Sequence, residues 1–142
     1  MSRRTPGSAE VRISISTDAD IITARGAGRS LAAQAGCSST DLTEVATAIS
    51  EIARNIVTYA GIGEISMRLT ERRDRFGIEI VAVDDGPGII DVDKALEDGY
   101  TTGTGLGLGL PGARRLMDDF RILSKPGRGT RIVMYKWCRK DD

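Results

Sequence analysis

The sequence predicts a single mixed α/β domain, and three observations lead to that class. Short stretches of alternating apolar and polar residues predict strands near the beginning, in the middle and near the end of the chain. Two longer stretches in the first half repeat apolar residues every three or four positions, as helices that pack by one face do. A length of 142 residues with 40% hydrophobic residues allows one buried core, and therefore one domain spanning 1–142.

The composition argues against several classes of function. The 20 basic and 20 acidic residues balance, so no net charge favours nucleic acid or an anionic membrane as a partner. No apolar run reaches membrane-spanning length, and the first residues lack the hydrophobic core of a signal peptide. Cys37 and Cys138 lie far apart, with no C-x-x-C pair and no histidine to complete a metal site, so a reducing cytoplasm fits best. Without histidine, any general base must be a carboxylate or a less usual group.

The first part of the chain is expected to form a strand and then a helix. Residues 1–9 are expected to be a flexible terminus. Residues 11–15 alternate apolar and polar side chains, which predicts a half-buried strand. A helix is expected over 21–35, with Asp18 or Asp20 as its cap. Its expected apolar face consists of Ile21, Ile22, Ala24, Leu31 and Ala35.

A second helix is expected over about 41–60, where Asp41 and Glu44 resemble a capping box. Its apolar stripe consists of Leu42, Val45, Ile49, Ile52, Ala53 and Ile56. Glu51 and Asn55 lie one turn apart on a neighbouring stripe, at the rim of the expected core. Spacing leaves two interpretations of this pair open, a solvated face or a functional one. The positions expected to face solvent are Thr43, Thr47, Ser50 and Arg54.

Two strands are expected next, and a polar turn follows the second. Residues 64–69 alternate, 72–75 are expected to form a charged hairpin loop, and 76–83 form an apolar run typical of a buried strand. The residues that follow are Asp84, Asp85, Gly86, Pro87, Gly88 and Ile89. Such a sequence is often only a turn. The functional alternative is a carboxylate at the strand end that accepts a hydrogen bond from a ligand, with glycines that let the ligand approach.

The glycine-rich stretch 99–112 contains six of the 17 glycines and leads into a helix expected from Pro111. Bare backbone before a helix offers several N–H groups and the positive end of the dipole to an anion, typically a phosphate. The alternative is a flexible linker, but leucines alternate with the glycines. A short helical stretch around 92–96 and a polar, threonine-rich lid are expected before it. Strands are expected after it over 122–124 and 130–137.

Common phosphate-binding motifs do not identify the ligand. The Walker pattern is absent, because no lysine follows these glycines. Gly107, Gly109 and Gly112 match the dinucleotide fingerprint G-x-G-x-x-G, but no buried strand precedes them. The same pattern opens eukaryotic-type protein kinases, whose H-R-D catalytic loop needs a histidine that this chain lacks.

Three motifs nevertheless follow one another along the chain: E-x-x-x-N on a helix, D-x-G-x-G after a strand, and G-x-G-x-G leading into a helix. From the Glu51 helix to Thr130, this order resembles the ATP-binding domain of the GHKL superfamily (gyrase, Hsp90, histidine kinase, MutL). The resemblance implies a Bergerat-type fold, an α+β two-layer sandwich with a mixed, mostly antiparallel sheet and helices packed on one face. Within the superfamily, the chain is most similar to the stand-alone RsbT-type switch kinases, and the Leu-Pro-Gly at 110–112 favours them over the sister anti-sigma-factor kinases.

The resemblance also implies roles for individual residues, with ATP and Mg²⁺ as ligands. Asn55 would complete the coordination of Mg²⁺, and Glu51 would be the general base that accepts the proton of the attacking hydroxyl. Asp84 would accept a hydrogen bond from the adenine amino group. The other residues expected near the adenine ring are Gly86, Gly88 and Thr130. The residues expected around the phosphates are Gly103, Thr104, Gly105, Leu106, Gly107, Leu108 and Gly109.

The function that the resemblance implies is phosphoryl transfer from ATP to serine or threonine of a STAS-domain antagonist or scaffold protein in a bacterial stressosome. The released kinase would then activate a PP2C-type phosphatase. An anti-sigma factor that sequesters a sigma factor and phosphorylates its antagonist is the alternative, and a catalytically inactive adaptor is a third. Neither nucleic acid nor membrane is expected as a partner, and a homodimer is compatible with all three functions.

Overall fold

The computed structural model of the chain describes residues 10–88 and 109–140. The strands are β1 (Val11–Ile15), β2 (Gly63–Arg72), β3 (Arg75–Asp84), β4 (Asp119–Ser124) and β5 (Thr130–Lys140). The helices are α1 (Asp18–Gln34), α2 (Ser39–Asn55), the π-helical turn η1 (Ile56–Ala60) and α4 (Gly109–Leu116). The terminus at 1–9, the helical stretch at 92–96 and most of the expected lid lie outside the described residues.

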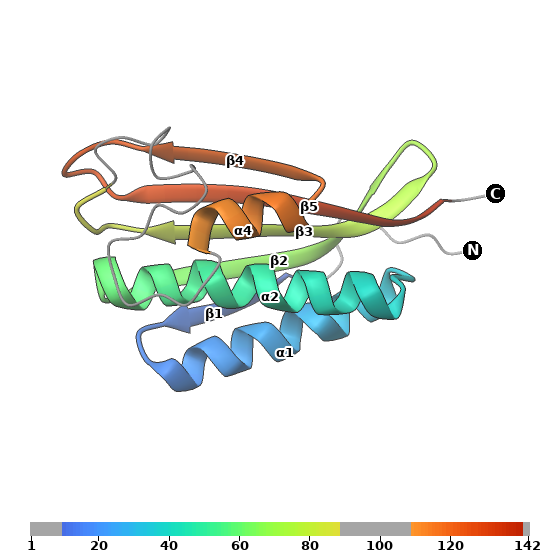
Figure 1. Cartoon of the computed structure of the whole chain (residues 1–142), viewed down its shortest axis with the longest axis horizontal. Helices are drawn as coiled ribbons and strands as arrows, with labels where there is room; N and C mark the ends of the chain where they lie inside the picture. Colours follow the sequence, from blue (N-terminus) through green and yellow to red (C-terminus); the bar gives the residue numbers. More distant parts are fainter. Residues whose placement is uncertain (1–9, 89–108, 141–142) are drawn as a thin grey trace.

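The strands form one sheet in the order β1-β2-β3-β5-β4. Each neighbouring pair in that order is antiparallel, so the described part of the sheet is antiparallel throughout rather than mixed. Helices α1, α2 and α4 lie side by side on one face of the sheet (Figure 1). The expected two-layer α+β sandwich is therefore confirmed.

The core lies between the helices and the inner face of the sheet. Alternate residues of each strand point inward, because successive side chains of a strand lie on opposite faces. Each fully buried isoleucine contributes about 1.5–3 kcal/mol through removal of apolar surface from water. Gly28 of α1 lies directly against α2, where a Cβ would overlap the Ile49 side chain. The largest fully buried side chains are Ile15, Val45, Ile49, Ile52, Ile65, Met67, Ile78, Ile80 and Met134.

Helix α1 begins three residues earlier than expected, and its N-cap is Thr17 rather than an aspartate. Asp20 completes a capping box with Thr17. Its carboxylate accepts the backbone N–H groups of Ser16 and Thr17, at 2.9 and 3.0 Å, and these bonds hold the pKa of Asp20 below its ordinary value. Ile22 was expected on the apolar face but is 61% exposed, because it lies about 100° around the helix from the buried Ile21.

Helix α2 also differs from expectation at both ends. Its N-cap is Ser38, whose hydroxyl accepts the N–H of Asp41, so Asp41 lies within the first turn instead of capping it. The regular helix ends at Asn55, and η1 continues it to Ala60 as a π-helical turn. The prediction that Ser50 faces solvent was wrong, because the residue is buried and its Oγ donates to the Ala46 carbonyl at 2.9 Å.

The outer face of the sheet carries a polar and aromatic cluster on β2, β3 and β5. Glu79 accepts hydrogen bonds from Arg68 at 2.8 Å and from the Tyr135 hydroxyl at 2.6 Å. The bond to Glu79 raises the pKa of Tyr135 above its ordinary value. Tyr135 stacks on Trp137 with ring centroids 5.5 Å apart, and the Arg72 guanidinium lies over both rings.

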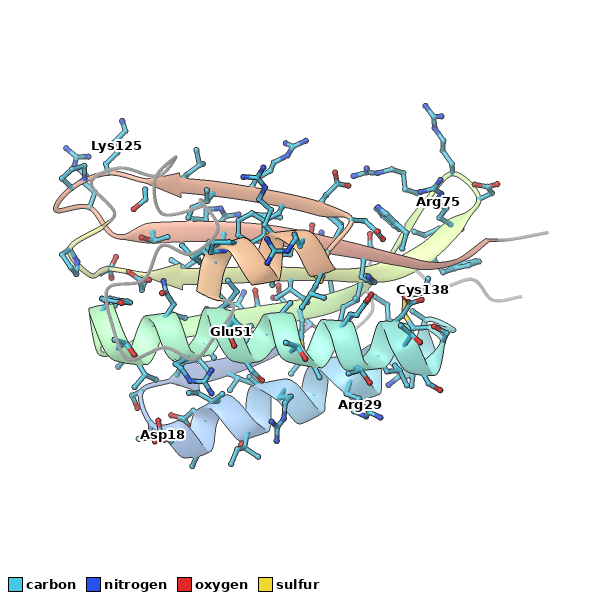
Figure 2. The ribbon with its side chains drawn as sticks, in the orientation of Figure 1. Asp18, Arg29, Glu51, Arg75, Lys125 and Cys138 are labelled. Carbon is cyan, nitrogen blue, oxygen red and sulfur yellow. A yellow bond between two sulfur atoms is a disulfide. The ribbon has the colours of Figure 1, made fainter. Side chains whose placement is uncertain are left out.

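Cys37 and Cys138 are joined as a disulfide, although 101 residues separate them. Their Cα atoms lie 4.5 Å apart, because β5 brings Cys138 beside the connection between α1 and α2. Figure 2 shows this bond at the N-terminal end of α2. The sequence interpretation treated the two cysteines as unrelated, and the structure corrects it. A long separation in the sequence does not mean that two residues lie far apart in the fold, because folding brings distant segments together.

Loss of this disulfide should lower the stability of the fold. In the chain-entropy description, a cross-link that closes a loop of about 100 residues stabilises the native state by about 4.7 kcal/mol, and typical measured values are about 2–4 kcal/mol. Urea unfolding of the wild type should therefore show a lower midpoint after addition of dithiothreitol. Cys138→Ser should show the same low midpoint and no response to the reductant. Equal midpoints for the oxidised wild type and Cys138→Ser would contradict a stabilising bond.

Candidate functional site

Glu51 lies on the side of α2 that faces α4 (Figure 2). Its side chain is only 14% exposed. One carboxylate oxygen accepts the backbone N–H of Gly109, the first residue of α4, at 3.1 Å. The other oxygen lies 3.5 Å from the guanidinium of Arg54, one turn further along α2. The two contacts fix the position of the carboxylate at the start of α4.

Helix α4 begins at Gly109, two residues before the expected start at Pro111, and its binding of an anion stays a prediction. Gly109 has φ of +59°, a conformation that glycine adopts without steric cost. Pro111 lies in the first turn, where its missing N–H costs no hydrogen bond. The free N–H groups of a first helical turn favour an anion, and in this structure the Glu51 carboxylate binds one of them. The expected phosphate-binding residues from Gly103 to Leu108 lie outside the described residues.

Asp84 and Thr130 were both expected near the adenine, and the structure brings them together. Asp84 is the last residue of β3, Thr130 is the first of β5, and the two are direct partners across the strands. One Asp84 carboxylate oxygen accepts the Gly86 N–H at 2.9 Å. The Thr130 hydroxyl lies 2.8 Å from that of Ser124 and is largely buried. The pairing of β3 with β5 therefore places both side chains at the same end of the sheet.

Gly86 and Gly88 were expected to leave room for a ligand, and the fold gives each a further reason to be glycine. A Cβ on Gly86 would lie 2.6 Å from the Cβ of Ala60 in η1. Gly88 has φ of +80°, and a Cβ there would overlap the Lys125 carbonyl. Both glycines therefore allow close packing of the turn after β3. Their contact with a nucleotide stays a prediction.

The predicted parts of the site form contacts in pairs. Glu51 contacts the start of α4, and Gly86 packs against Ala60, the last residue of η1. In Figure 1 the end of α2, the end of β3 and the start of β5 lie at the left of the view, and α4 begins further in, above α2. A single bound nucleotide would have to reach each of these pairs.

Asn55 is the last residue of α2 and is partly exposed. Its carboxamide makes no hydrogen bond to another described residue. The Asn55 carboxamide offers an oxygen atom, which is the type of ligand that Mg²⁺ prefers in combination with phosphate. The residue therefore fits a magnesium–nucleotide site.

One other cluster has metal-ligand chemistry within residues 10–88 and 109–140, and it consists of Cys37, Asp41 and Cys138. Its two sulfur atoms bond to each other here, which leaves no thiolate to bind a cation. The cluster lies at the N-terminal end of α2, about 10 residues or 15 Å from Glu51 along the helix. It is therefore separate from the candidate site.

Sequence reasoning missed Arg54 as a member of the site. It was assigned to the solvated face, and its side chain is indeed 55% exposed, but the guanidinium still reaches Glu51. The signal was present in the spacing, because residues three apart on a helix are neighbours.

Among the described helices, none combines the length and apolar character needed to cross a bilayer.

Comparison with known proteins identifies relatives along most of the chain. Residues 15–136 match the family described as "Histidine kinase-like ATPase domain". The chain is 47% identical over 127 residues to the serine/threonine-protein kinase RsbT of Bacillus subtilis (strain 168), covering 89% of this chain and 96% of that protein. It is 32% identical over 107 residues to the anti-sigma F factor of Caldanaerobacter subterraneus subsp. tengcongensis, covering 71% of this chain and 73% of that protein.

Solved structures show the same fold at lower identity. The RsbU and RsbW domains of Rv1364c from Mycobacterium tuberculosis superpose with a TM-score of 0.65 at 19% identity, over 94% of this chain and 34% of that one. The mycobacterial sensor histidine kinase MprB superposes with a TM-score of 0.52 at 22% identity, over 70% of this chain and 73% of that one.

Proposed function

The chain belongs to the histidine kinase-like ATPase family, and from this premise we propose that it is a switch kinase of a bacterial partner-switching pathway. It is a serine/threonine protein kinase that uses ATP, as its 47% identity to RsbT over most of both chains indicates. The observation that carries the proposal is the position of Glu51, a carboxylate at the start of the helix that would hold phosphate. That position suits a base next to a transferring phosphoryl group.

The nucleotide would lie across the three predicted parts of the site. Asp84 would accept the adenine amino group, with Thr130 beside it. The backbone before α4 and the Gly109 N–H would bind phosphate oxygens. Asn55 would hold Mg²⁺, which supplies charge neutralisation for the phosphates when bound.

The reaction would be an in-line transfer. The serine or threonine oxygen attacks the γ-phosphorus, its proton passes to Glu51, and the bond to the β-phosphate oxygen breaks to leave ADP. Most of the rate enhancement in such reactions comes from positioning and from stabilisation of charge. The protein contributes the fixed spacing between α2 and α4.

The substrate would be a STAS-domain antagonist or scaffold protein of a bacterial stressosome, and the free kinase would activate a PP2C-type phosphatase. The second candidate function is that of an anti-sigma factor kinase, which the 32% identity to an anti-sigma F factor favours. Both functions use the same nucleotide site. They differ in the protein that the nucleotide-bound chain retains.

One experiment tests the proposal and separates it from the second candidate. The purified chain is incubated with labelled Mg·ATP and each STAS-domain protein encoded nearby, and label transfer to serine or threonine is located by mass spectrometry. A pull-down with the same chain accompanies it. Label on a STAS protein together with a captured PP2C-type phosphatase supports the switch kinase. A captured sigma factor would favour the second candidate, and absence of transfer to any STAS protein would overturn the proposal.

Asp84→Asn should weaken nucleotide binding. The amide has only one acceptor oxygen, and while that oxygen accepts the Gly86 N–H, its NH2 group faces the adenine amino group, which needs an acceptor. Hydrogen bonds to charged groups contribute about 1.5–3 kcal/mol, or roughly 10- to 100-fold in affinity. ATP affinity can be measured by equilibrium titration. Asp85→Asn, at the exposed neighbouring position, serves as the matched control and should bind ATP as the wild type does. Unchanged affinity in Asp84→Asn would contradict the adenine contact.

A further inference from the structure

Helix α4 is fixed to α2 at both of its ends. At its N-terminus, Gly109 donates its N–H to Glu51. At its C-terminus, the carbonyl of Leu116 accepts a hydrogen bond of 2.6 Å from the ammonium group of Lys136 on β5. The same ammonium donates to Glu44 of α2 at 2.7 Å. Lys136 therefore joins the end of α4 to α2 through one charged atom.

The spacing of these contacts is the same on both helices. Glu44 and Glu51 are seven residues apart on α2, and Gly109 and Leu116 are seven residues apart on α4. Seven residues make about two turns, or roughly 10.5 Å, and bring both ends of the interval to the same side of a helix. The two helices run in opposite directions between these contacts. Helix α4 is therefore attached to α2 at two points. Glu51 makes the attachment at the start of α4, next to the candidate site, and Lys136 makes the attachment at the end of α4.

Lys136 is an unusual residue for its position. Its side chain is only 7% exposed, and it lies on the inner face of β5 in register with the buried Ile132 and Met134. A buried ammonium is costly unless several acceptors surround it. Besides Glu44 and the Leu116 carbonyl, Asp41 lies 3.9 Å away. The positive charge also faces the C-terminal end of α4, where the helix dipole favours a cation.

A buried ion pair is often no more stabilising than well-packed apolar side chains, so stability alone gives a weak reason for a lysine here. We propose that Lys136 is a positioning residue for phosphoryl transfer, which holds α4 at a fixed distance along α2 so that the Gly109 N–H stays in register with Glu51. This inference rests on the proposed kinase function, because it assigns the purpose of the attachment to the nucleotide site. Lys136 acts only through α4 and touches neither nucleotide nor substrate.

The test compares Lys136→Met, which is one heavy atom shorter and removes the charge, with Lys136→Arg, which keeps the charge. Arg68→Met is the matched control, because it removes an ion pair with Glu79 on the outer face of the sheet. Amide hydrogen exchange of the nucleotide-free proteins is measured along α4 and along α1, and kcat and KM for ATP are measured in phosphotransfer. Glu44→Gln provides a milder removal of the same attachment.

In Lys136→Met, exchange of the α4 amides should accelerate several-fold while α1 stays protected, since only α4 loses its attachment. The kcat should fall by up to about 100-fold, because a misplacement of the reacting groups by about 1 Å can cost that much. Lys136→Arg should recover most of both properties, Glu44→Gln should change them less in the same direction, and Arg68→Met should match the wild type.

Two results would overturn the inference. One is wild-type exchange in α4 together with wild-type kcat in Lys136→Met. The other is uniform acceleration in α1 and α4 with no rescue by arginine, which indicates a merely structural lysine. If Lys136→Met does not fold, Glu44→Gln decides between the same outcomes. Failure of the wild type to bind or use ATP would instead overturn the proposed function, while the exchange measurement would still report whether Lys136 holds α4.

Discussion

Glu51→Gln should reduce phosphotransfer by about 10²- to 10⁴-fold, the range that general base catalysis typically contributes. Glutamine keeps an oxygen that can accept the Gly109 N–H, so the attachment of α2 to the start of α4 should survive. The amide cannot accept the proton of the attacking hydroxyl. ATP affinity should therefore stay close to that of the wild type while kcat falls. Single-turnover transfer to a STAS-domain substrate and equilibrium binding of ATP measure the two quantities separately.

The control for this variant is Glu64→Gln, which changes an exposed carboxylate on β2 outside the site. Its phosphotransfer rate should equal that of the wild type. Glu51→Ala removes the Gly109 contact as well. Its kcat should equal that of Glu51→Gln, and its ATP affinity should differ from that of the wild type more than the affinity of Glu51→Gln does. An active Glu51→Gln enzyme would rule out Glu51 as the base, since a carboxamide at that position cannot serve.

The sequence pattern predicted the order and type of the elements better than their ends. Strand alternation and helical spacing survive in the fold because both follow from which side chains must be buried. The ends depend on local hydrogen bonds that compete closely. Ser38 and Thr17 cap their helices although Asp41 and Asp18 offer similar groups nearby. Ser50 is buried because its hydroxyl can donate to the Ala46 carbonyl, an option that a pattern of polar and apolar letters does not record.

Some residues of the site and its surroundings could likewise be predicted from the sequence, and others could not. Glu51, Asp84, Gly109 and Thr130 were predicted from motifs, and the structure pairs Glu51 with Gly109 and Asp84 with Thr130. Lys136 belongs to none of the sequence motifs. Its partners come from α2 and from the end of α4, so its environment exists only once the sheet has brought residues 92 positions apart together. The Cys37–Cys138 bond escaped the sequence interpretation for the same reason.

Asn55→Ala should remove the magnesium-dependent part of ATP binding. Asn55 ends α2 one turn after Glu51, and its carboxamide oxygen would be the protein's ligand to the metal ion. Loss of a group that only orients a metal ligand already costs about 10- to 100-fold in metal affinity, so loss of the ligand itself should cost at least as much. ATP titrations in Mg²⁺ and in EDTA measure the difference directly. The wild type should bind far more tightly in Mg²⁺, and Asn55→Ala should bind equally weakly in both.

Asn55→Asp separates loss of a ligand from damage to the helix. A carboxylate supplies an oxygen of the same reach, so this variant should keep a response to Mg²⁺ even if its added charge weakens binding of the phosphates. Both variants lie where α2 passes into η1, so a defect caused only by disturbance of that junction would appear in both. A magnesium titration of Asn55→Ala identical to that of the wild type would exclude Asn55 as a metal ligand. The cation would then have to be held by phosphate, water and other protein groups alone.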